Sequence, residues 1–234
     1  MRVYKYFLLI KKRINSFLRN KSKTAVLWDL RQKNKQGGGN QLKILDAGCG
    51  NDSAMNTKII LPNAYYVGID VEDYNTKEKS YADEYWVVNP TEFANFIGRF
   101  HKEFDIVLST HNLEHCDDRV STLNALLEAT KINGIIYLCF PTASSVGFPS
   151  RGGVLNYYDD STHKYEPIDF FWARKTLINS GFDILFQEVK YQPFALRISG
   201  MVLEPISRII NQNLLGTWEY WGFESILLGR RIKK

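Results

Sequence analysis

The stretch "LKILDAGCG", residues 42–50, decides the fold of this chain. It is a short apolar run that ends in two closely spaced glycines, which is typical of a buried strand followed by a tight turn. Similar strand-like runs follow: "AYYVGID" (64–70), "EYWVVN" (84–89), "FDIVLST" (104–110), "GIIYLCF" (134–140), "FDILFQEVKY" (182–191) and "YWGFESILLGRRI" (220–232). Helix- or loop-like segments separate most of them. This alternation predicts an α/β fold with a doubly wound, mostly parallel seven-stranded sheet.

A ligand pocket is predicted at the turn after the first strand. Gly48 and Gly50 let the backbone approach a ligand closely at the carboxyl edge of the sheet, where such folds bind. A dinucleotide fingerprint needs a third glycine, but Ser53 stands at that position. Asp70 ends the second strand and can accept both hydroxyls of a ribose. The pattern favours an adenosine ligand over a dinucleotide.

Four motifs, "ILDAGCG", "YYVGID", "FDIVLSTHNLEH" and "INGIIYLCFP", come in an order that resembles class I S-adenosylmethionine-dependent methyltransferases over residues 42–190. The resemblance implies a Rossmann-like methyltransferase fold with S-adenosylmethionine as cofactor. The first motif would line its methionine part and Asp70 would hold its ribose. Asn89 ends the third strand, where the family often has an acid that contacts adenine. The implied cofactor-binding residues are Asp46, Gly48, Cys49, Gly50, Asp70 and Asn89.

The stretch "FPSRGGVLNYYDDSTHKYEP", residues 148–167, resembles bacterial methyltransferases of surface-polysaccharide synthesis. That resemblance implies O-methylation of a sugar or sugar-lipid intermediate. Loops at this edge of the sheet usually select the acceptor, and tyrosines beside carboxylates suit a sugar. Alternatively, the loop only folds over the sheet. The candidate acceptor-binding residues are Tyr157, Tyr158, Asp159, Asp160 and His163.

The stretch "STHNLEHCDD", residues 109–118, supplies the catalytic candidates His111, Glu114 and His115. If a helical turn begins here, the three side chains face the same way, into the cleft that holds the cofactor. A histidine could then serve as general base with Glu114 orienting it. Read literally, H-x-x-E-H is also a zinc-peptidase motif, but the nucleotide pocket just upstream argues against that interpretation.

A metal site is the second interpretation of the same residues. Some methyltransferases that bind a divalent cation carry E-x-x-E-H after the fourth strand, and some add a histidine downstream, which His163 resembles. The implied ligands, His111, Glu114, His115 and His163, suit zinc, iron or manganese better than magnesium. The third interpretation is a purely structural role, in which these residues shape the floor of the pocket.

Composition bounds the remaining possibilities. A hydrophobic fraction of 44% over 234 residues predicts one well-buried domain, and three unpaired cysteines predict a cytoplasmic protein. Residues 1–35 carry eleven Lys or Arg and one acid, whereas the rest is net acidic. We therefore divide the chain into a basic amphipathic arm (1–36) that forms an N-terminal amphipathic helix, a Gly-rich joint (37–41) and a methyltransferase domain (42–234) with a helical insertion at 194–215 before the last strand. The apolar positions of the arm are Phe7, Leu8, Ile14, Phe17 and Leu18.

The expected partner is a small-molecule or glycan acceptor. Peripheral contact with the inner face of the membrane through residues 1–23 or 194–215 is the further expectation, since both segments combine apolar and basic residues. Segment 194–215 could equally be a dimer face, a lid or core, and the oligomeric state stays open. The acidic domain makes nucleic acid an unlikely partner. A non-catalytic cofactor-binding scaffold and a nucleotide-dependent oxidoreductase remain as alternative functions.

Overall fold

The structure is a computed structural model that describes residues 2–73 and 81–233, with side chains in the first helix described from residue 8. The side chain of Phe7 therefore lies outside the described residues. Seven strands form one sheet: β1 Lys43–Ala47, β2 Tyr65–Asp70, β3 Glu84–Val87, β4 Phe104–Thr110, β5 Thr130–Pro141, β6 Phe182–Glu188 and β7 Glu224–Arg231. The α-helices are α1 Arg2–Leu18, α2 Lys23–Gln36, α3 Ser53–Ile60, α4 Phe93–Ile97, α5 Arg119–Ala129, α6 Phe170–Asn179, α7 Phe194–Ile210 and α8 Thr217–Trp221.

The sheet has the strand order β3-β2-β1-β4-β5-β7-β6. Neighbouring strands from β3 to β5 are parallel, and β7 runs antiparallel to both β5 and β6. The order reverses direction at β1 and β4, whose carboxyl ends lie side by side, and such a reversal is where doubly wound sheets bind ligands. The predicted doubly wound, mostly parallel seven-stranded sheet is confirmed.

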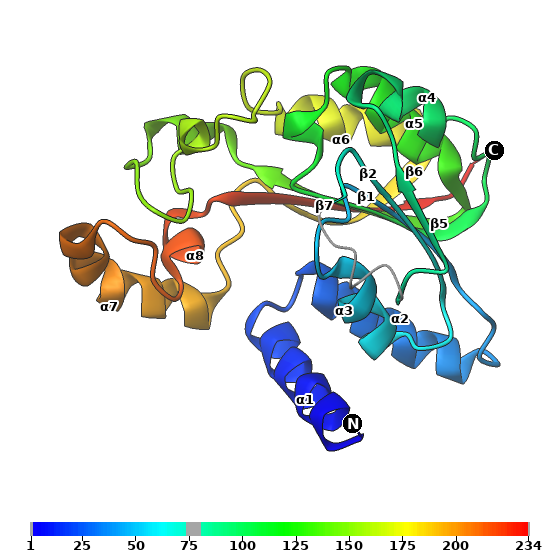
Figure 1. The fold of residues 1–234 in the computed structure, drawn as a ribbon, viewed down its shortest axis with the longest axis horizontal. Coiled ribbons are helices and arrows are strands. Elements are labelled where there is room, and N and C mark those ends of the chain that lie inside the picture. Colours follow the sequence, from blue (N-terminus) through cyan, green and yellow to red (C-terminus); the bar gives the residue numbers. More distant parts are fainter. Residues whose placement is uncertain (1, 74–80, 234) are drawn as a thin grey trace.

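Helices cover both faces of the sheet, as Figure 1 shows: α4, α5 and α6 lie on one side and α2 and α3 on the other, with α1 beyond them. The strands are buried on both faces, so alternate residues of β1 enter different cores. Leu45 packs in the core beneath α5, whereas Ile44 packs with Leu27 of α2. This double cover leaves the strand ends as the place for a pocket.

The N-terminal arm forms two helices. Ser22 separates them because its side chain accepts a hydrogen bond from the backbone N–H of Ala25 and caps α2. Val26 and Leu27 of α2 are buried against the sheet. The glycine joint begins where α2 ends, and both Gly38 and Gly39 have positive φ. The second half of the arm is thus packed on the domain.

Segment 194–215 is helical for most of its length. It contains α7, and the short helix α8 follows it before β7. α8 occupies part of the segment 220–232, which we expected to be strand-like throughout. Within the described residues, 2–73 and 81–233, no helix is long and apolar enough to cross a membrane.

Candidate functional site

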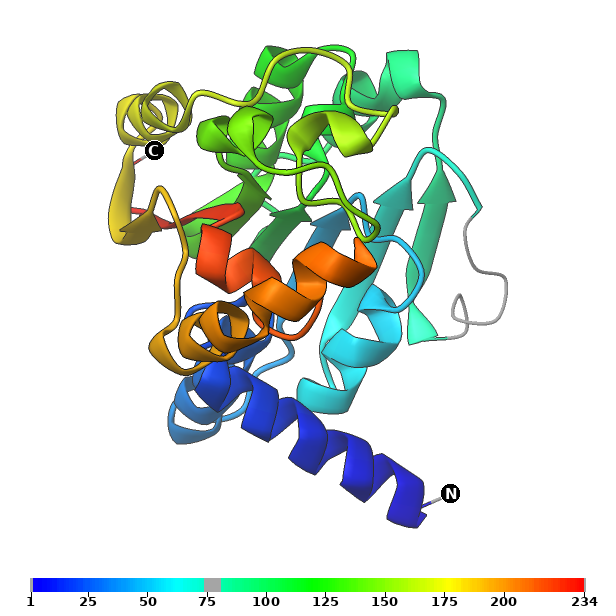
Figure 2. The same ribbon diagram turned by 90° about the vertical axis from the view of Figure 1, so that its left-hand side faces the viewer.

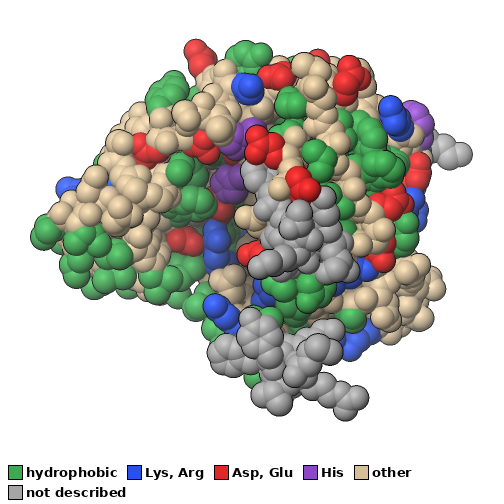
Figure 3. Space-filling model, in the orientation of Figure 1, with side chains coloured by type: hydrophobic (Ala, Val, Ile, Leu, Met, Phe, Trp, Pro, Cys, Tyr) green, Lys and Arg blue, Asp and Glu red, His purple; other side chains and the backbone are tan. Residues whose placement is uncertain are grey.

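A cavity of about 460 Å³ opens at the carboxyl ends of β1, β2 and β4. Gly48, Gly50 and Asp70 line one part of it, and His111 and His115 line another. Its other lining residues include Glu72, Phe93, Asn112, Asp117, Asp160, Thr162 and Lys164. Histidine side chains lie beside acidic ones on this face of the molecule (Figure 3). The predicted cofactor and catalytic segments therefore share one cavity.

The two glycines of the turn have different roles. Both are left-handed, with φ of +68° at Gly48 and +56° at Gly50. A Cβ on Gly48 would lie 2.5 Å from the Cβ of Asn112, so the backbone needs glycine there for close approach as well as for its φ. A Cβ on Gly50 would meet no described atom within 4 Å. Gly50 thus lies beside open space, which leaves room for a ligand.

Asp70 connects the second strand to this turn. Its carboxylate accepts hydrogen bonds from the backbone N–H of Gly50 at 2.7 Å and of Val71 at 2.8 Å. The side chain is buried, and burial raises its pKa although these backbone donors oppose the shift. Each carboxylate oxygen keeps a further lone pair that can accept from a hydroxyl. A carboxylate held in this way, next to open space at Gly50, fits the ribose of an adenosine cofactor.

The other predicted cofactor residues lie around the cavity without lining it. Asp46 is fully buried and accepts from the Tyr66 hydroxyl at 2.8 Å and from Lys23 Nζ at 3.4 Å. Its Oδ1 has no hydrogen-bond partner among the described residues. Cys49 is buried, which raises the pKa of its thiol. Asn89 caps the next turn, and the following residue, Pro90, reaches the cavity. Their contacts with the cofactor stay predictions.

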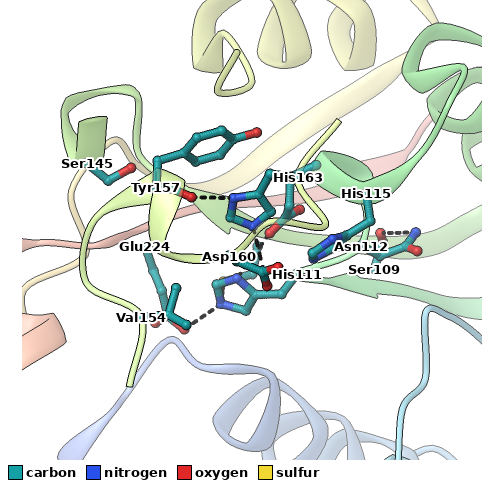
Figure 4. A network of polar contacts seen from close by, with 12 residues as sticks. Ser109, His111, Asn112, His115, Ser145, Val154, Tyr157, Asp160, His163 and Glu224 are labelled. Atoms are coloured by element: carbon teal, nitrogen blue, oxygen red, sulfur yellow. Dashed lines mark hydrogen bonds and ion pairs between the residues drawn. The ribbon is translucent and has the colours of Figure 1, made fainter. Parts of the chain in front are cut away.

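His111 lies between two carboxylates. It directly follows β4 with a left-handed φ of +49°, and its backbone N–H donates to the Cys139 carbonyl. Nδ1 is 3.2 Å from Glu114 and Nε2 is 3.1 Å from Glu224, as Figure 4 shows for the second contact. Burial alone lowers the His111 pKa, but Cys139 and the two carboxylates outweigh it and hold it well above the ordinary value. The two carboxylates thus favour the charged form of His111.

Glu224 also links the site to the N-terminal arm. It forms an ion pair with Arg19, whose Nε lies 3.1 Å from Glu219 of α8. Burial raises the pKa of Glu224, but His111 and Arg19 together bring it below its ordinary value. The sequence analysis did not find this contact because 205 positions separate Arg19 from Glu224 and no local pattern joins them.

His115 and His163 form the other half of the histidine cluster (Figure 4), with ring centroids 4.8 Å apart. His163 Nδ1 lies 2.6 Å from the Tyr157 carbonyl, so it must donate there. The Thr162 hydroxyl donates to Asp160 and therefore accepts from His115 Nδ1 at 2.9 Å. In both rings this tautomer leaves the lone pair on Nε2, ready to accept a proton or bind a cation.

Glu114 lies behind the histidines and is fully buried. Its Oε2 has no hydrogen-bond partner within the part of the chain that the structure describes. Ligand atoms of Glu114, His115 and His163 all lie within 4.8 Å of one another, while His111 belongs to a separate group with Cys139 and Glu224. The four residues predicted as metal ligands thus lie close together but divide into two groups.

The prediction that His111, Glu114 and His115 share one face of a helical turn is wrong for His111. Only residues Leu113–His115 form a turn, a 3₁₀ helix, because the left-handed backbone at His111 interrupts a helix that would include it. His111 and His115 line the cavity as expected, whereas Glu114 does not.

Only some of the polar residues of the predicted acceptor loop line the cavity. Asp160 lines it, but Asp159 accepts backbone N–H groups of Arg151, Leu155 and Asn156 and so fixes the shape of the loop. The loop residues Tyr157 and Tyr158 meet edge to face rather than stacked, at 84°. Tyr157 is buried and stacks on His163 at 4.1 Å, whereas Tyr158 is 65% exposed.

Comparison with known proteins gives the domain an identity. Residues 45–138 match the family model described as a methyltransferase domain. This range begins inside β1 and ends inside β5, and it contains the glycine turn, Asp70 and the histidine segment. No curated protein matches the chain.

Solved structures share the fold at low sequence identity. A SAM-dependent methyltransferase from Archaeoglobus fulgidus is 18% identical with a TM-score of 0.52, covering 93% of this chain and 98% of that one. An S-adenosylmethionine-dependent methyltransferase from Mesorhizobium loti is 15% identical with a TM-score of 0.56, covering 91% and 99%. At such identities the likeness shows the fold alone. The chain thus carries a matched methyltransferase domain on a fold that it shares with these S-adenosylmethionine-dependent methyltransferases.

Proposed function

We propose that this enzyme methylates a hydroxyl group of a sugar or sugar-lipid intermediate. The observation that carries the proposal is the single cavity in which Gly50 and Asp70 share walls with His115, Thr162 and Asp160. A cofactor placed at the glycine turn would have His115 at the same edge of the sheet, within the same cavity. The resemblance of the acceptor loop to polysaccharide methyltransferases supports a sugar as the acceptor class.

Methyl transfer from S-adenosylmethionine needs no covalent intermediate with the protein. S-adenosylmethionine supplies the methyl group from its sulfonium centre, so the chain must orient the acceptor and take its proton. His115 is suited to take the proton because the Asp160–Thr162–His115 chain of hydrogen bonds leaves Nε2 with its lone pair. His111 is unsuited because Glu114 and Glu224 favour its charged form. We therefore assign His115 as the general base and His111 and Glu114 as residues that position the pocket wall.

The polar lining supports a hydroxyl-rich acceptor. Asp117, Asp160 and Lys164 surround the histidine end of the cavity, and carboxylates accept hydrogen bonds from sugar hydroxyls. Buried, unpaired Cys49, Cys116 and Cys139 support a reducing compartment such as the cytoplasm.

A divalent cation at Glu114, His115 and His163 is a second candidate for the same step. The buried Glu114 Oε2 without a partner among the described residues favours it, and two imidazoles with one carboxylate suit zinc, iron or manganese. Such an ion lowers the pKa of a bound hydroxyl. The chain itself would hold the Nε2 lone pairs toward the ion through the Thr162 and Tyr157 hydrogen bonds.

The test measures methyl transfer to a panel of nucleotide sugars and lipid-linked sugars, with His115→Gln and His101→Gln compared. His101 is exposed and serves as the matched control. We expect an O-methylated sugar, a kcat lowered about 100-fold or more in His115→Gln, and an unchanged control. Transfer only to nitrogen acceptors, or an unchanged kcat in His115→Gln, contradicts the proposal.

The metal content of the purified protein distinguishes catalysis by His115 as general base from catalysis with a bound cation. If the cation is present, it co-purifies with the wild type and is lost in His163→Ala but not in His101→Ala. Full activity in chelator-treated, metal-free protein leaves His115 as the base.

A further inference from the structure

Helix α7 is amphipathic, but it packs on the protein through its less apolar face. Its buried residues are Leu196, Gly200, Glu204 and Ser207, which repeat at helical spacing. Gly200 allows the close contact, because a Cβ there would lie 2.0 Å from the Gly216 carbonyl oxygen. The other face of α7 carries exposed apolar side chains: Phe194, Ile198, Met201, Val202, Ile206, Ile209 and Ile210. Phe194 and Ile209 are 81% and 84% exposed.

Helix α1 adds a second exposed apolar stripe. Ile10, Ile14 and Phe17 follow at helical spacing, and Phe17 is 83% exposed. Exposed Lys11 and Arg13 lie between these residues in sequence. We call the exposed apolar residues of α1 and α7, with the cations between the two helices, the α1–α7 surface.

A cationic cavity joins the two helices. It is about 420 Å³ in volume and lies between the end of α1 and the start of α7. Lys21, Lys190 and Arg197 line it together with Phe186 and Phe194, and Glu188 is its one acidic lining residue. Figures 1 and 2 both place the start of α7 near the end of α1, and Figure 3 shows the hydrophobic cover over α7. The wall of this cavity thus combines three cations with aromatic side chains.

We propose that the α1–α7 surface docks on an anionic lipid bilayer. Helices that lie in a membrane interface combine a strongly apolar face with Lys and Arg at its edges, and the apolar side chains enter the acyl boundary. The cavity cations would meet lipid phosphates, and the basic arm adds long-range attraction. A second copy of the chain fits less well, because a two-fold contact would bring the basic cavities of the two subunits near each other. The inference holds whichever acceptor the enzyme methylates.

Two contacts connect this surface with the reaction site. Arg151, in the acceptor loop, forms a buried ion pair with Glu204 of α7 at 2.6 Å. Arg19, which follows α1, binds Glu224, the partner of His111. The docked helices would therefore hold the cavity at a fixed distance from the bilayer, where a lipid-linked acceptor is presented.

Flotation with vesicles tests the proposal on the full-length chain. Vesicles of phosphatidylcholine with phosphatidylglycerol should bind it, and phosphatidylcholine alone should bind it much less. We expect Phe194→Ser with Ile209→Ser to weaken binding about tenfold or more, since two exposed apolar anchors are lost. Lys21→Glu with Arg197→Glu should weaken it by a similar factor, and more so at low salt.

Matched control positions lie on α6, which is on the face of the sheet opposite to α2 and α3 in Figure 1. Ile178→Ser removes an apolar side chain that is 43% exposed, and Lys175→Glu reverses an exposed charge. Both should bind vesicles as the wild type does. Equal binding by the α7 double variant and Ile178→Ser overturns the proposal. So does a dimer that the α7 variant converts to a monomer in light scattering while wild-type protein ignores the vesicles.

Discussion

Single residues at the glycine turn set how closely the backbone packs at the edge of the cavity. Gly48 and Gly50 share a left-handed φ, but only at Gly48 would an added Cβ come within 2.5 Å of Asn112. Gly50→Ala should cost about 1–2 kcal/mol, the usual penalty for this backbone region. Gly48→Ala should cost several kcal/mol more, because Asn112 must move as well. Urea unfolding of the two variants measures the difference, and equal losses would contradict the close contact.

His111 gives a pH dependence of stability. Its folded pKa is raised above the ordinary 6.5, so its contribution is complete below that pH and is lost as the pH rises through the folded value. The free energy of unfolding should therefore be higher for the wild type than for His111→Asn, and the difference should be largest below pH 6.5. The difference should shrink as the pH rises. Denaturant unfolding across the pH range checks the sign. A difference that grows with pH contradicts the two-carboxylate arrangement.

The sequence could predict residues whose role depends on their neighbours in the chain. Gly48, Gly50 and Asp70 follow from strand ends and spacing, and the structure places all three in the cavity wall. Arg19 and Glu224 depend on tertiary contact between the arm and the last strand, which no local pattern encodes. The four predicted metal ligands divide into two groups, and His111 stands apart from the other three. This separation likewise depends on the left-handed backbone at His111.

At the scale of elements, strands were easier to predict than helices. The apolar runs at 42–50 and 104–110 became β1 and β4 because strands buried on both faces need continuous apolar sequence. α8 lies partly inside a run that resembles a strand, and tertiary packing between α7 and β7 decides its helical state. The arm was expected to be one helix, although Ser22 carried the capping signal for a second.

Helix α7 and the acceptor loop depend on one buried ion pair. Glu204 accepts two hydrogen bonds from Arg151, which lower its pKa to about 2. Glu204→Gln should destabilise the protein by about 3 kcal/mol, because Arg151 stays buried without its counter-charge. The wild-type advantage should be complete above pH 4.5 and fall as the pH drops toward 2. Thermal or urea unfolding of both proteins tests this, and a constant difference down to pH 2 contradicts it.

At the scale of the whole molecule, the domain arrangement gives the cavity two neighbours, the basic arm and the α7 insertion. Both approach the carboxyl edge of the sheet, and Arg19 and Arg151 connect them to it. The sequence predicted two membrane-contact segments separately, and the structure places the end of one beside the start of the other. Lys21, which follows α1, lies over the ring of Phe186 in β6, the strand that precedes α7.

The central claim is that the cavity at Gly50 and Asp70 binds S-adenosylmethionine. Calorimetric titration of the wild type and Asp70→Ala with S-adenosylmethionine and with NAD tests it most directly. The account predicts micromolar binding of S-adenosylmethionine by the wild type, affinity at least about tenfold weaker in a folded Asp70→Ala, and no binding of NAD. Binding of NAD, or failure of the wild type to bind S-adenosylmethionine, would contradict it.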